Sequence, residues 1–168
     1  MRAQRAVARF LHYLSAERNT SEYTRRNYHD DLVHFFHLLE HKRLREITPL
    51  DVRAFLADQS TKRYSKRTIA RRLSCVRSFF RFLCREGLLT QNPATVVPTP
   101  RLEHRLPQFL DEQQMARLLE APPTERWQGL RDRALLETLY STGVRVSELV
   151  GLNLDDMDEI SGTAIVRG

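Results

Sequence analysis

The sequence predicts a mainly α-helical chain in two parts: a bundle of four or five helices over residues 1–96, and the start of an α+β domain over 108–168. Through the first ninety residues, apolar side chains recur at intervals of three, four and seven, the spacing of helices that bury one face. The stretch 97–107 breaks this pattern with three prolines and several charges, as a linker does. A strand-like sequence, "GTAIVRG", closes the second part.

Four helices of the first part can be placed by their start signals and apolar positions. The first spans about 3–16, and the second begins after Ser21, which can cap it. Thr48, followed by a proline and then an acid in the first turn, starts the third. Ser65 opens the fourth, which runs to about Arg85 and stops at a glycine. The residues expected to form the shared core are Val7, Phe10, Leu11, Leu14, Tyr28, Leu32, Phe35, Phe36, Leu39, Val52, Phe55, Leu56, Ile69, Leu73, Val76, Phe79, Phe80 and Leu83.

The second part is expected to contain three helices and one strand. Asp111 with Gln114 forms a capping-box pattern at the start of the first of these helices. The next helix spans about 128–142 and ends at Gly143, and a short helix covers 147–152. The closing strand has no evident partner in the sequence. The residues that the 128–142 helix is expected to bury are Leu130, Ala134, Leu135, Thr138 and Leu139.

The charge of the chain is divided unevenly between the two parts. Residues 1–92 contain 19 Lys and Arg against 9 Asp and Glu, a net of +10, whereas residues 93–168 contain 8 against 12, a net of −4. A strongly basic first part indicates that it holds a polyanion. No run approaches 18 apolar residues, so no membrane-spanning segment is expected.

The fourth helix carries much of this positive charge. From Thr61 to Arg85 there are nine Lys or Arg residues and no acid. At about 100° per residue, the apolar side chains cover one side, with Arg72 as the exception and Arg77 at the edge. A solvated face is the ordinary explanation, but an unrelieved positive run repels itself unless an anion binds, which favours nucleic acid over an anionic membrane surface. The cationic side consists of Arg67, Arg71, Ser74, Ser78, Arg81 and Arg85.

One arginine lies in an apolar setting at a break between two helices. In "STGVRVSELVGL", residues 141–152, Arg145 follows a glycine and a valine and is flanked by further apolar residues. Such a side chain is expected to be half buried, and a half-buried guanidinium requires an anionic partner.

No metal or cofactor is expected. Asp30, His34, His37 and His41 project from one side of the second helix at spacings that could gather metal ligands, but a polar outer face explains them equally well. The two cysteines lie nine residues apart on one helix, on nearly opposite faces, so they cannot form a disulfide with each other there. The sequence has no CxxC pair, and its cysteine usage fits a reducing compartment.

Several segments resemble one known family. "RDRALLETLYSTGVRVSELVGLNLDDMD", residues 131–158, is similar to the first catalytic box of the tyrosine recombinases, close to the Xer type that resolves chromosome dimers. Upstream, "SEYTRRNYHDDL", "SKRTIARRLSCVRSFFRFL" and "NPA" resemble the core-binding domain of these enzymes. The resemblance covers essentially the whole chain. It implies a SAM-like, DNA-binding core-binding domain followed by the first part of a catalytic domain.

The resemblance implies a reaction and two catalytic roles. In the family, a tyrosine attacks a DNA phosphate and forms a 3′-phosphotyrosyl link, while charge builds on the non-bridging oxygens. The arginine of the box, here Arg145, grips the scissile phosphate. The acid, here Glu148, supports the site and could orient the arginine through a hydrogen-bonded pair. A structural turn with a local ion pair between these two residues is the alternative.

The resemblance also implies the DNA contacts. In the family, the second and fourth helices of the core-binding domain enter the major groove, and the two domains form a C-shaped clamp joined by a segment that corresponds to 97–107. Arginine forks suit phosphate oxygens or guanine. By position, and from the cationic side of the fourth helix, the expected DNA-contacting residues are Thr24, Arg25, Arg26, Arg67, Thr68, Arg71, Ser74 and Arg81.

The later catalytic residues of the family have no counterpart in these 168 residues. Members continue with a β-hairpin that carries a general-acid lysine, a His-x-x-Arg box, a further histidine or tryptophan, and the nucleophilic tyrosine. We therefore expect this chain alone to bind DNA without cutting it. We also expect weak cyclic assembly, because the C-terminal helix by which Xer subunits engage each other is missing.

The partners implied by the resemblance are double-stranded DNA and a second recombinase subunit. The DNA would be a palindromic recombination site with a short spacer, and the full-length protein would join a second subunit or paralogue in a tetrameric synapse. The implied setting is cytoplasmic and nucleoid-associated, in chromosome partition at cell division. Two alternatives stay open: a phage or transposon integrase, and a non-catalytic DNA-binding regulator that keeps the fold.

Overall fold

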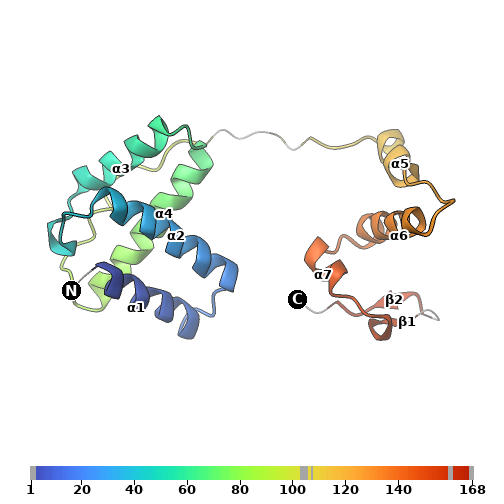
Figure 1. Cartoon of the computed structure of the whole chain (residues 1–168), viewed down its shortest axis with the longest axis horizontal. Helices are drawn as coiled ribbons and strands as arrows, with labels where there is room; N and C mark the ends of the chain where they lie inside the picture. The colour runs from blue at the N-terminus through green and yellow to red at the C-terminus, as the bar shows by residue number, and fades with distance from the viewer. Residues whose placement is uncertain (1–2, 103–105, 107, 159–160, 167–168) are drawn as a thin grey trace. The chain divides into compact units, whose positions relative to one another are not determined.

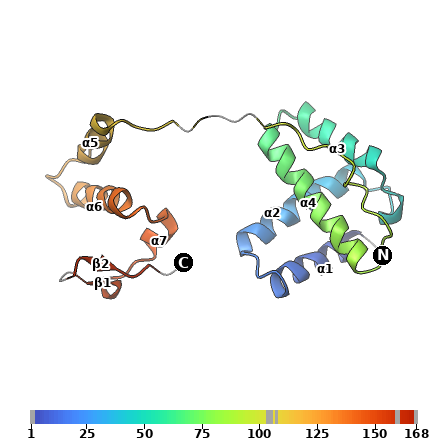
Figure 2. The same ribbon diagram turned by 180° about the vertical axis from the view of Figure 1, so that it is seen from behind.

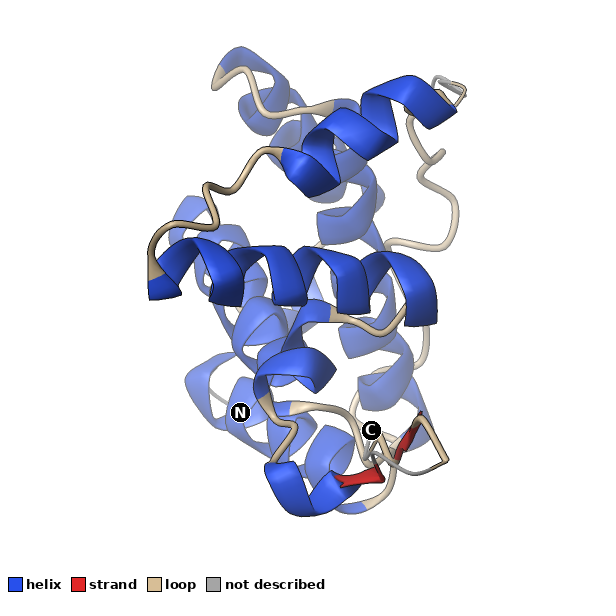
Figure 3. Ribbon diagram, turned by 90° about the vertical axis from the view of Figure 1, so that its right-hand side faces the viewer, coloured by secondary structure: helices blue, strands red, loops and turns tan. Residues whose placement is uncertain are grey.

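The structure, a computed structural model, describes residues 3–102, 106, 108–158 and 161–166. The chain divides into two compact units, Met1–His104 and Arg105–Gly168 (Figure 1). Helices dominate both units (Figure 3). Across the described ranges, no helix is long and apolar enough to cross a membrane.

The described residues of the first unit form four α-helices and one short 3₁₀ turn. The sequence-based starts of the helices are confirmed by their caps. Ser21 and Ser65 each accept a hydrogen bond from the backbone N–H three residues later, at 3.3 and 3.1 Å. Thr48 donates from both its N–H and its hydroxyl to Asp51, at 2.8 and 2.9 Å. The elements are α1 (Ala3–Ala16), α2 (Glu22–Leu38), η1 (Leu44–Glu46), α3 (Pro49–Thr61) and α4 (Lys66–Arg85).

Helix α4 lies at the centre of this unit and packs against α1, α2 and α3 (Figures 1 and 2). Ten of its residues are buried. A cluster of aromatic rings fills the space between the helices, with Phe79 contacting Phe10 edge-on at 5.5 Å and Phe36 at 5.6 Å between ring centroids. The predicted core is confirmed, with Leu11, Tyr28, Phe36 and Leu56 partly buried against it rather than fully enclosed.

The chain that follows α4 folds back onto the bundle. Ala94 and Val97 are buried in the core. Arg77 holds this segment: it donates to the Ala94 carbonyl at 3.1 Å, to the Val97 carbonyl, and to the Thr99 hydroxyl at 2.8 Å. The side chain of Asn92 donates in turn to the Arg77 carbonyl at 3.1 Å. The chain thus stays attached to the bundle through Thr99.

Within its described residues, the second unit contains three α-helices, one short 3₁₀ turn and a two-stranded hairpin. The predicted capping box is present, with Gln114 N–H 2.8 Å from Asp111 Oδ1 and Asp111 N–H 3.1 Å from Gln114 Oε1. Gly129 has no room for a side chain, because a Cβ there would lie 1.6 Å from the carbonyl oxygen of Pro123. The elements are α5 (Glu112–Glu120), α6 (Trp127–Thr142), α7 (Val146–Val150), η2 (Leu154–Asp156), β1 (Met157–Asp158) and β2 (Thr163–Ala164).

The expectation that the closing strand lacks a partner is wrong. The closing strand does have a partner: β2 pairs antiparallel with β1, Met157 opposite Ala164 and Asp158 opposite Thr163. A two-residue strand is too short for its side-chain alternation to be read from the sequence.

The burial predicted for α6 is also wrong. Leu130, Ala134 and Leu135 are exposed, and Thr138 and Leu139 are only partly covered. Among the described residues of this unit, α5 and α7 are the elements that make substantial contact with α6, and they leave most of its surface uncovered.

The central position of Phe79 predicts a large loss of stability when its ring is removed. Phe79→Ala should lower the free energy of unfolding of the first unit by about 3–5 kcal/mol, because it leaves a cavity between α1, α2 and α4. Urea unfolding followed by circular dichroism measures this change. Tyr23→Ala, on the exposed side of α2, is the matched control and should change stability by less than about 0.5 kcal/mol. Equal effects of the two variants would contradict the role given to Phe79.

Candidate functional site

The first turn of α2 carries three of the predicted DNA-contacting residues, and two of them are tied to neighbouring side chains. Thr24 shares a hydroxyl–hydroxyl hydrogen bond of 3.0 Å with Ser21 at the helix start. Arg25 donates to the hydroxyl of Ser15 at 2.6 Å. Arg26 is exposed and forms only a loose ion pair, 3.7 Å from Glu22. All three lie at or near the surface, where a ligand can reach them.

The first turn of α4 repeats the cap of α2. Thr68 and Ser65 share a hydroxyl–hydroxyl hydrogen bond of 2.9 Å, as Thr24 and Ser21 do. Unlike α2, this turn contains no acid. Its positive helix end is therefore not neutralised locally, which favours an anion beside it. Arg67, in the same turn, is exposed.

The cationic side of α4 is less continuous than the sequence suggests. Arg77 donates its hydrogen bonds to the chain over residues 94–99. Arg85 donates to the hydroxyl of Tyr13 at 3.0 Å and to the carboxylate of Glu17 at 3.3 Å. Ser74 is exposed and donates to a carbonyl one turn back. In the part of the chain that the structure describes, Arg67 and Arg81 have no ion pair or hydrogen bond from their side chains. These two arginines keep their charge available to a ligand.

Arg71, another of the predicted DNA-contacting residues, is paired with an acid of α2. Its two terminal nitrogens bind both oxygens of Asp31, at 2.5 Å (Nη1 to Oδ2) and 2.9 Å (Nη2 to Oδ1). The Asp31 side chain is 3% exposed, whereas that of Arg71 is 44% exposed. Arg71 therefore lies at the surface, as expected, but its charge is already paired with a buried carboxylate on α2.

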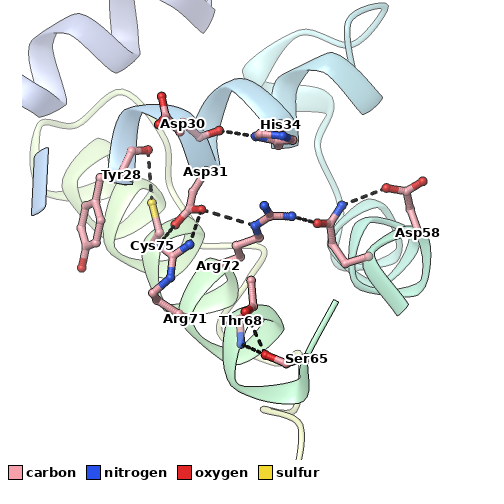
Figure 4. A network of polar contacts seen from close by, with 11 residues as sticks. Tyr28, Asp30, Asp31, His34, Asp58, Ser65, Thr68, Arg71, Arg72 and Cys75 are labelled. Carbon is pink, nitrogen blue, oxygen red and sulfur yellow. Dashed lines mark hydrogen bonds and ion pairs between the residues drawn. The ribbon is translucent and has the colours of Figure 1, made fainter. Parts of the chain in front are cut away.

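Arg72, the exception on the apolar side of α4, joins the same network (Figure 4). Its Nε lies 3.4 Å from Asp31 Oδ1, within ion-pair distance but without hydrogen-bond geometry. Its Nη1 donates to the side-chain oxygen of Gln59 on α3, and its guanidinium lies 4.1 Å from the centre of the Tyr64 ring. The network thus connects α2, α3 and α4 through polar side chains.

Asp31 was not among the predicted functional residues. Burial raises the pKa of its carboxyl above the ordinary value, and the hydrogen bonds and charge of Arg71 offset part of that shift. Two signals in the sequence could have identified it. Asp31 lies three residues after Tyr28 and four before Phe35, on the apolar stripe of α2, and Arg72 lies on the apolar stripe of α4. Two opposite charges on facing apolar stripes indicate a buried pair.

Arg145 lies between α6 and α7, as predicted, but it is not half buried. Helix α6 ends at Gly143, whose φ is +66°, and α7 begins at Val146. The Arg145 side chain is 81% exposed, and its apolar neighbours are at most partly covered. Its Nη1 donates to Glu148 Oε1 at 2.6 Å, and its backbone N–H donates to Oε2 at 2.7 Å.

The Arg145–Glu148 pair has a clear effect on the acid. The backbone N–H and the side chain of Arg145 both donate to the carboxylate and lower the pKa of Glu148 below its ordinary value. The Nε and Nη2 atoms of Arg145 form no hydrogen bond with the described residues, so their N–H groups remain available to a ligand. The pair therefore presents an oriented, partly unoccupied guanidinium fork.

The histidine-rich side of α2 shows no arrangement of metal ligands. His34 bonds through Nδ1 to the Asp30 carbonyl at 2.7 Å, and His29 bonds to the Asp30 carboxylate at 3.1 Å. Within the described ranges, no three His, Cys, Asp or Glu side chains are grouped so that they could hold a metal ion. Cys75 and Cys84 are free thiols, and burial raises the pKa of both.

Comparison with known proteins identifies the family. Residues 7–87 match the phage integrase N-terminal SAM-like domain, and residues 108–168 match the phage integrase family. These two matches cover the helical bundle and the unit that carries Arg145. The chain belongs to the phage integrase family, the tyrosine recombinases.

Individual relatives place the chain near the Xer type. It is 40% identical over 162 residues to the tyrosine recombinase XerC of Thermodesulfovibrio yellowstonii, covering 96% of this chain and 54% of the relative. It is 44% identical over 170 residues to XerC of Pelotomaculum thermopropionicum, covering 96% and 56%. The chain thus spans about half the length of the curated relatives it matches.

A solved structure shows the same fold. A lambda integrase (residues 75–356) dimer bound to a COC′ core site superposes with a TM-score of 0.76 at 19% identity, covering 99% of this chain and 62% of that one. At this identity the likeness concerns the fold alone.

The hydrogen bonds between Arg145 and Glu148 predict the titration of the acid. In a carboxyl NMR titration, the midpoint of Glu148 should lie below the ordinary glutamate value. Arg145→Ala should raise it only part of the way, because the backbone N–H at position 145 still donates.

Since the pKa of Glu148 is lower in the folded state than in the unfolded state, the pair stabilises the unit above the unfolded-state pKa and loses this effect as the pH falls through the folded-state pKa. Arg133→Ala, which removes an equal charge from α6, should leave the midpoint unchanged. A Glu148 midpoint at or above the ordinary value would contradict the pairing.

Proposed function

We propose that this chain is the part of a Xer-type, site-specific tyrosine recombinase that binds DNA and contacts the scissile phosphate. The whole enzyme would cut and rejoin double-stranded DNA through a 3′-phosphotyrosyl intermediate. The observation that carries this proposal is that the helical bundle and the Arg145–Glu148 junction both lie within matches to one family, in the order that the family has them.

The first unit would hold the duplex. It is strongly basic, and its two exposed helix starts carry Thr24 and Thr68 in the same capped arrangement. Arg67 and Arg81 are the arginines of α4 whose charges are free in the described structure. Their guanidinium groups can each take two phosphate oxygens, or the O6 and N7 atoms of guanine. Arg25, Arg26 and Ser74 would add contacts at the edges of this surface.

The second unit would supply the catalytic arginine. During transesterification, negative charge builds on the non-bridging oxygens of the scissile phosphate. Arg145 can donate to them from Nε and Nη2, while Glu148 holds its Nη1 and its backbone N–H. Glu148 would thus orient the guanidinium before DNA arrives, so that less freedom is lost on binding.

The proposed partners follow from the relatives. The DNA would be a palindromic recombination site with a short spacer, and the complete protein would work with a second subunit or paralogue, in keeping with the lambda integrase dimer bound to a core site. The similarity to XerC proteins supports a place in chromosome dimer resolution and partition at cell division, in the cytoplasm and at the nucleoid.

A DNA footprint tests this function against its rivals. We expect the 168-residue chain to protect two inverted half-sites separated by a spacer of a few base pairs, because each copy should occupy one half-site. Nuclease protection on selected genomic fragments measures this. Protection of a single asymmetric operator would favour a regulator, and the absence of protection at any site would refute the proposal.

The unpaired arginines of α4 predict how binding depends on salt. Because each phosphate-bound cation releases counterions, Arg67→Ala combined with Arg81→Ala should reduce the slope of log K against log [salt] by about two. Fluorescence anisotropy with a labelled duplex at several salt concentrations measures the slope. Arg53→Ala on α3, an exposed arginine with no ion pair in the described structure, is the control and should leave the slope unchanged. An unchanged slope in the double variant would show that α4 does not face DNA.

A further inference from the structure

Asp31 is the only acid with a buried side chain among the described residues of the first unit. We propose that it is a positioning residue for DNA binding, which withholds Arg71 from the DNA and fixes α4 against α2 so that Arg67 points in one direction. This inference rests on the proposed DNA-binding function, and it names a residue that determines which arginines of α4 take part.

The geometry of the pair joins the two helices that would contact DNA. Asp31 lies on α2 and Arg71 on α4, and their side chains meet in two hydrogen bonds that use both carboxylate oxygens and both terminal nitrogens (Figure 4). A pairing of this kind fixes the distance and the rotation between its two groups. Arg67 is one helical turn before Arg71, so its position relative to α2 is set by the same contact.

Arg71 cannot leave Asp31 without cost. If it turned toward a DNA phosphate, the buried carboxylate would lose both of its hydrogen bonds. Arg72 does not replace them, because its Nε lacks hydrogen-bond geometry to Asp31 and its Nη1 is bound to Gln59. A phosphate contact at the surface is screened by water and salt. The loss of hydrogen bonds at the buried carboxylate therefore outweighs the gain from a screened phosphate contact, and Arg71 stays on Asp31 when DNA is bound.

This arrangement separates the arginines of α4 into two kinds. Arg67 and Arg81 should each neutralise a phosphate and release counterions, whereas Arg71 is already neutralised and should not. An additional phosphate contact would strengthen binding to every sequence equally, so the pair affects the ratio of specific to non-specific affinity through the fixed position of Arg67 and not through the charge of Arg71.

The decisive experiment compares two neighbouring acids of α2 in the whole chain. Asp31→Asn should free the charge of Arg71, steepen the salt slope by about one, and lower the ratio of specific to non-specific affinity. Asp30→Asn makes the same change of charge one residue away, at an exposed carboxylate, and should leave both quantities unchanged. Equal slopes in the two variants would overturn the proposal, because net charge alone would then explain the effect.

A second pair of variants tests Arg71 directly. Arg67→Gln should reduce the salt slope by about one, whereas Arg71→Gln should not reduce it. If Arg71→Gln reduces the slope as much as Arg67→Gln does, Arg71 contacts DNA and the proposal is wrong.

The unmodified chain gives a test that does not depend on the folding of any variant. On titration with DNA, the side-chain N–H signals of Arg67 should shift in ¹⁵N NMR spectra, while those of Arg71 stay in place. A shift of the Arg71 signals equal to that of Arg67 would overturn the proposal. If the unmodified chain fails to bind DNA at all, the proposed function itself is refuted, which distinguishes that failure from a wrong role for Asp31.

Discussion

Helix α4 has to satisfy two opposite requirements, and the first unit is arranged around them. It buries ten residues against the other three helices, yet it also carries most of its arginines toward solvent. Burial of the aromatic cluster around Phe79 and Phe80 supplies the driving force, because large rings removed from water contribute more than any surface contact. The directions in which the polar side chains point are a consequence of that packing.

The arginines of α4 are distributed between structural and available roles. Arg71 joins α4 to α2, Arg77 joins it to the chain over 94–99, and Arg85 joins it to α1. Each of these contacts uses a positive charge inside the molecule, so a helix rich in arginine is less self-repelling than its sequence suggests. The charges of Arg67 and Arg81 remain available to a ligand, so this surface offers fewer unpaired cations than the sequence suggests.

The second unit differs from the first in that its functional pair joins residues close together in the sequence. Arg145 and Glu148 are three residues apart, and the start of α7 places the backbone N–H and the guanidinium of Arg145 at the same carboxylate. A pair of this kind forms without help from distant parts of the chain. This explains why it is intact although the apolar side chains around it, such as Val146 and Val150, are exposed.

The sequence alone determined the features that depend on near neighbours along the chain. Helix starts at Ser21, Thr48 and Ser65, the apolar stripes of the first unit, and the junction at Arg145 were all predicted, because caps, periodicity and a glycine stop act within one or two turns. The resemblance to the family is likewise contained in the sequence, because it rests on contiguous motifs.

Tertiary structure decided which charges are free and which faces are covered. Asp31 and Arg71 are 40 residues apart, so no local pattern shows that their side chains meet. The exposure of Arg145 and of α6 likewise depends on which elements pack against them and not on their own sequence. Whether a charged side chain is paired, buried or available is a property of the space around it, and only the folded chain defines that space.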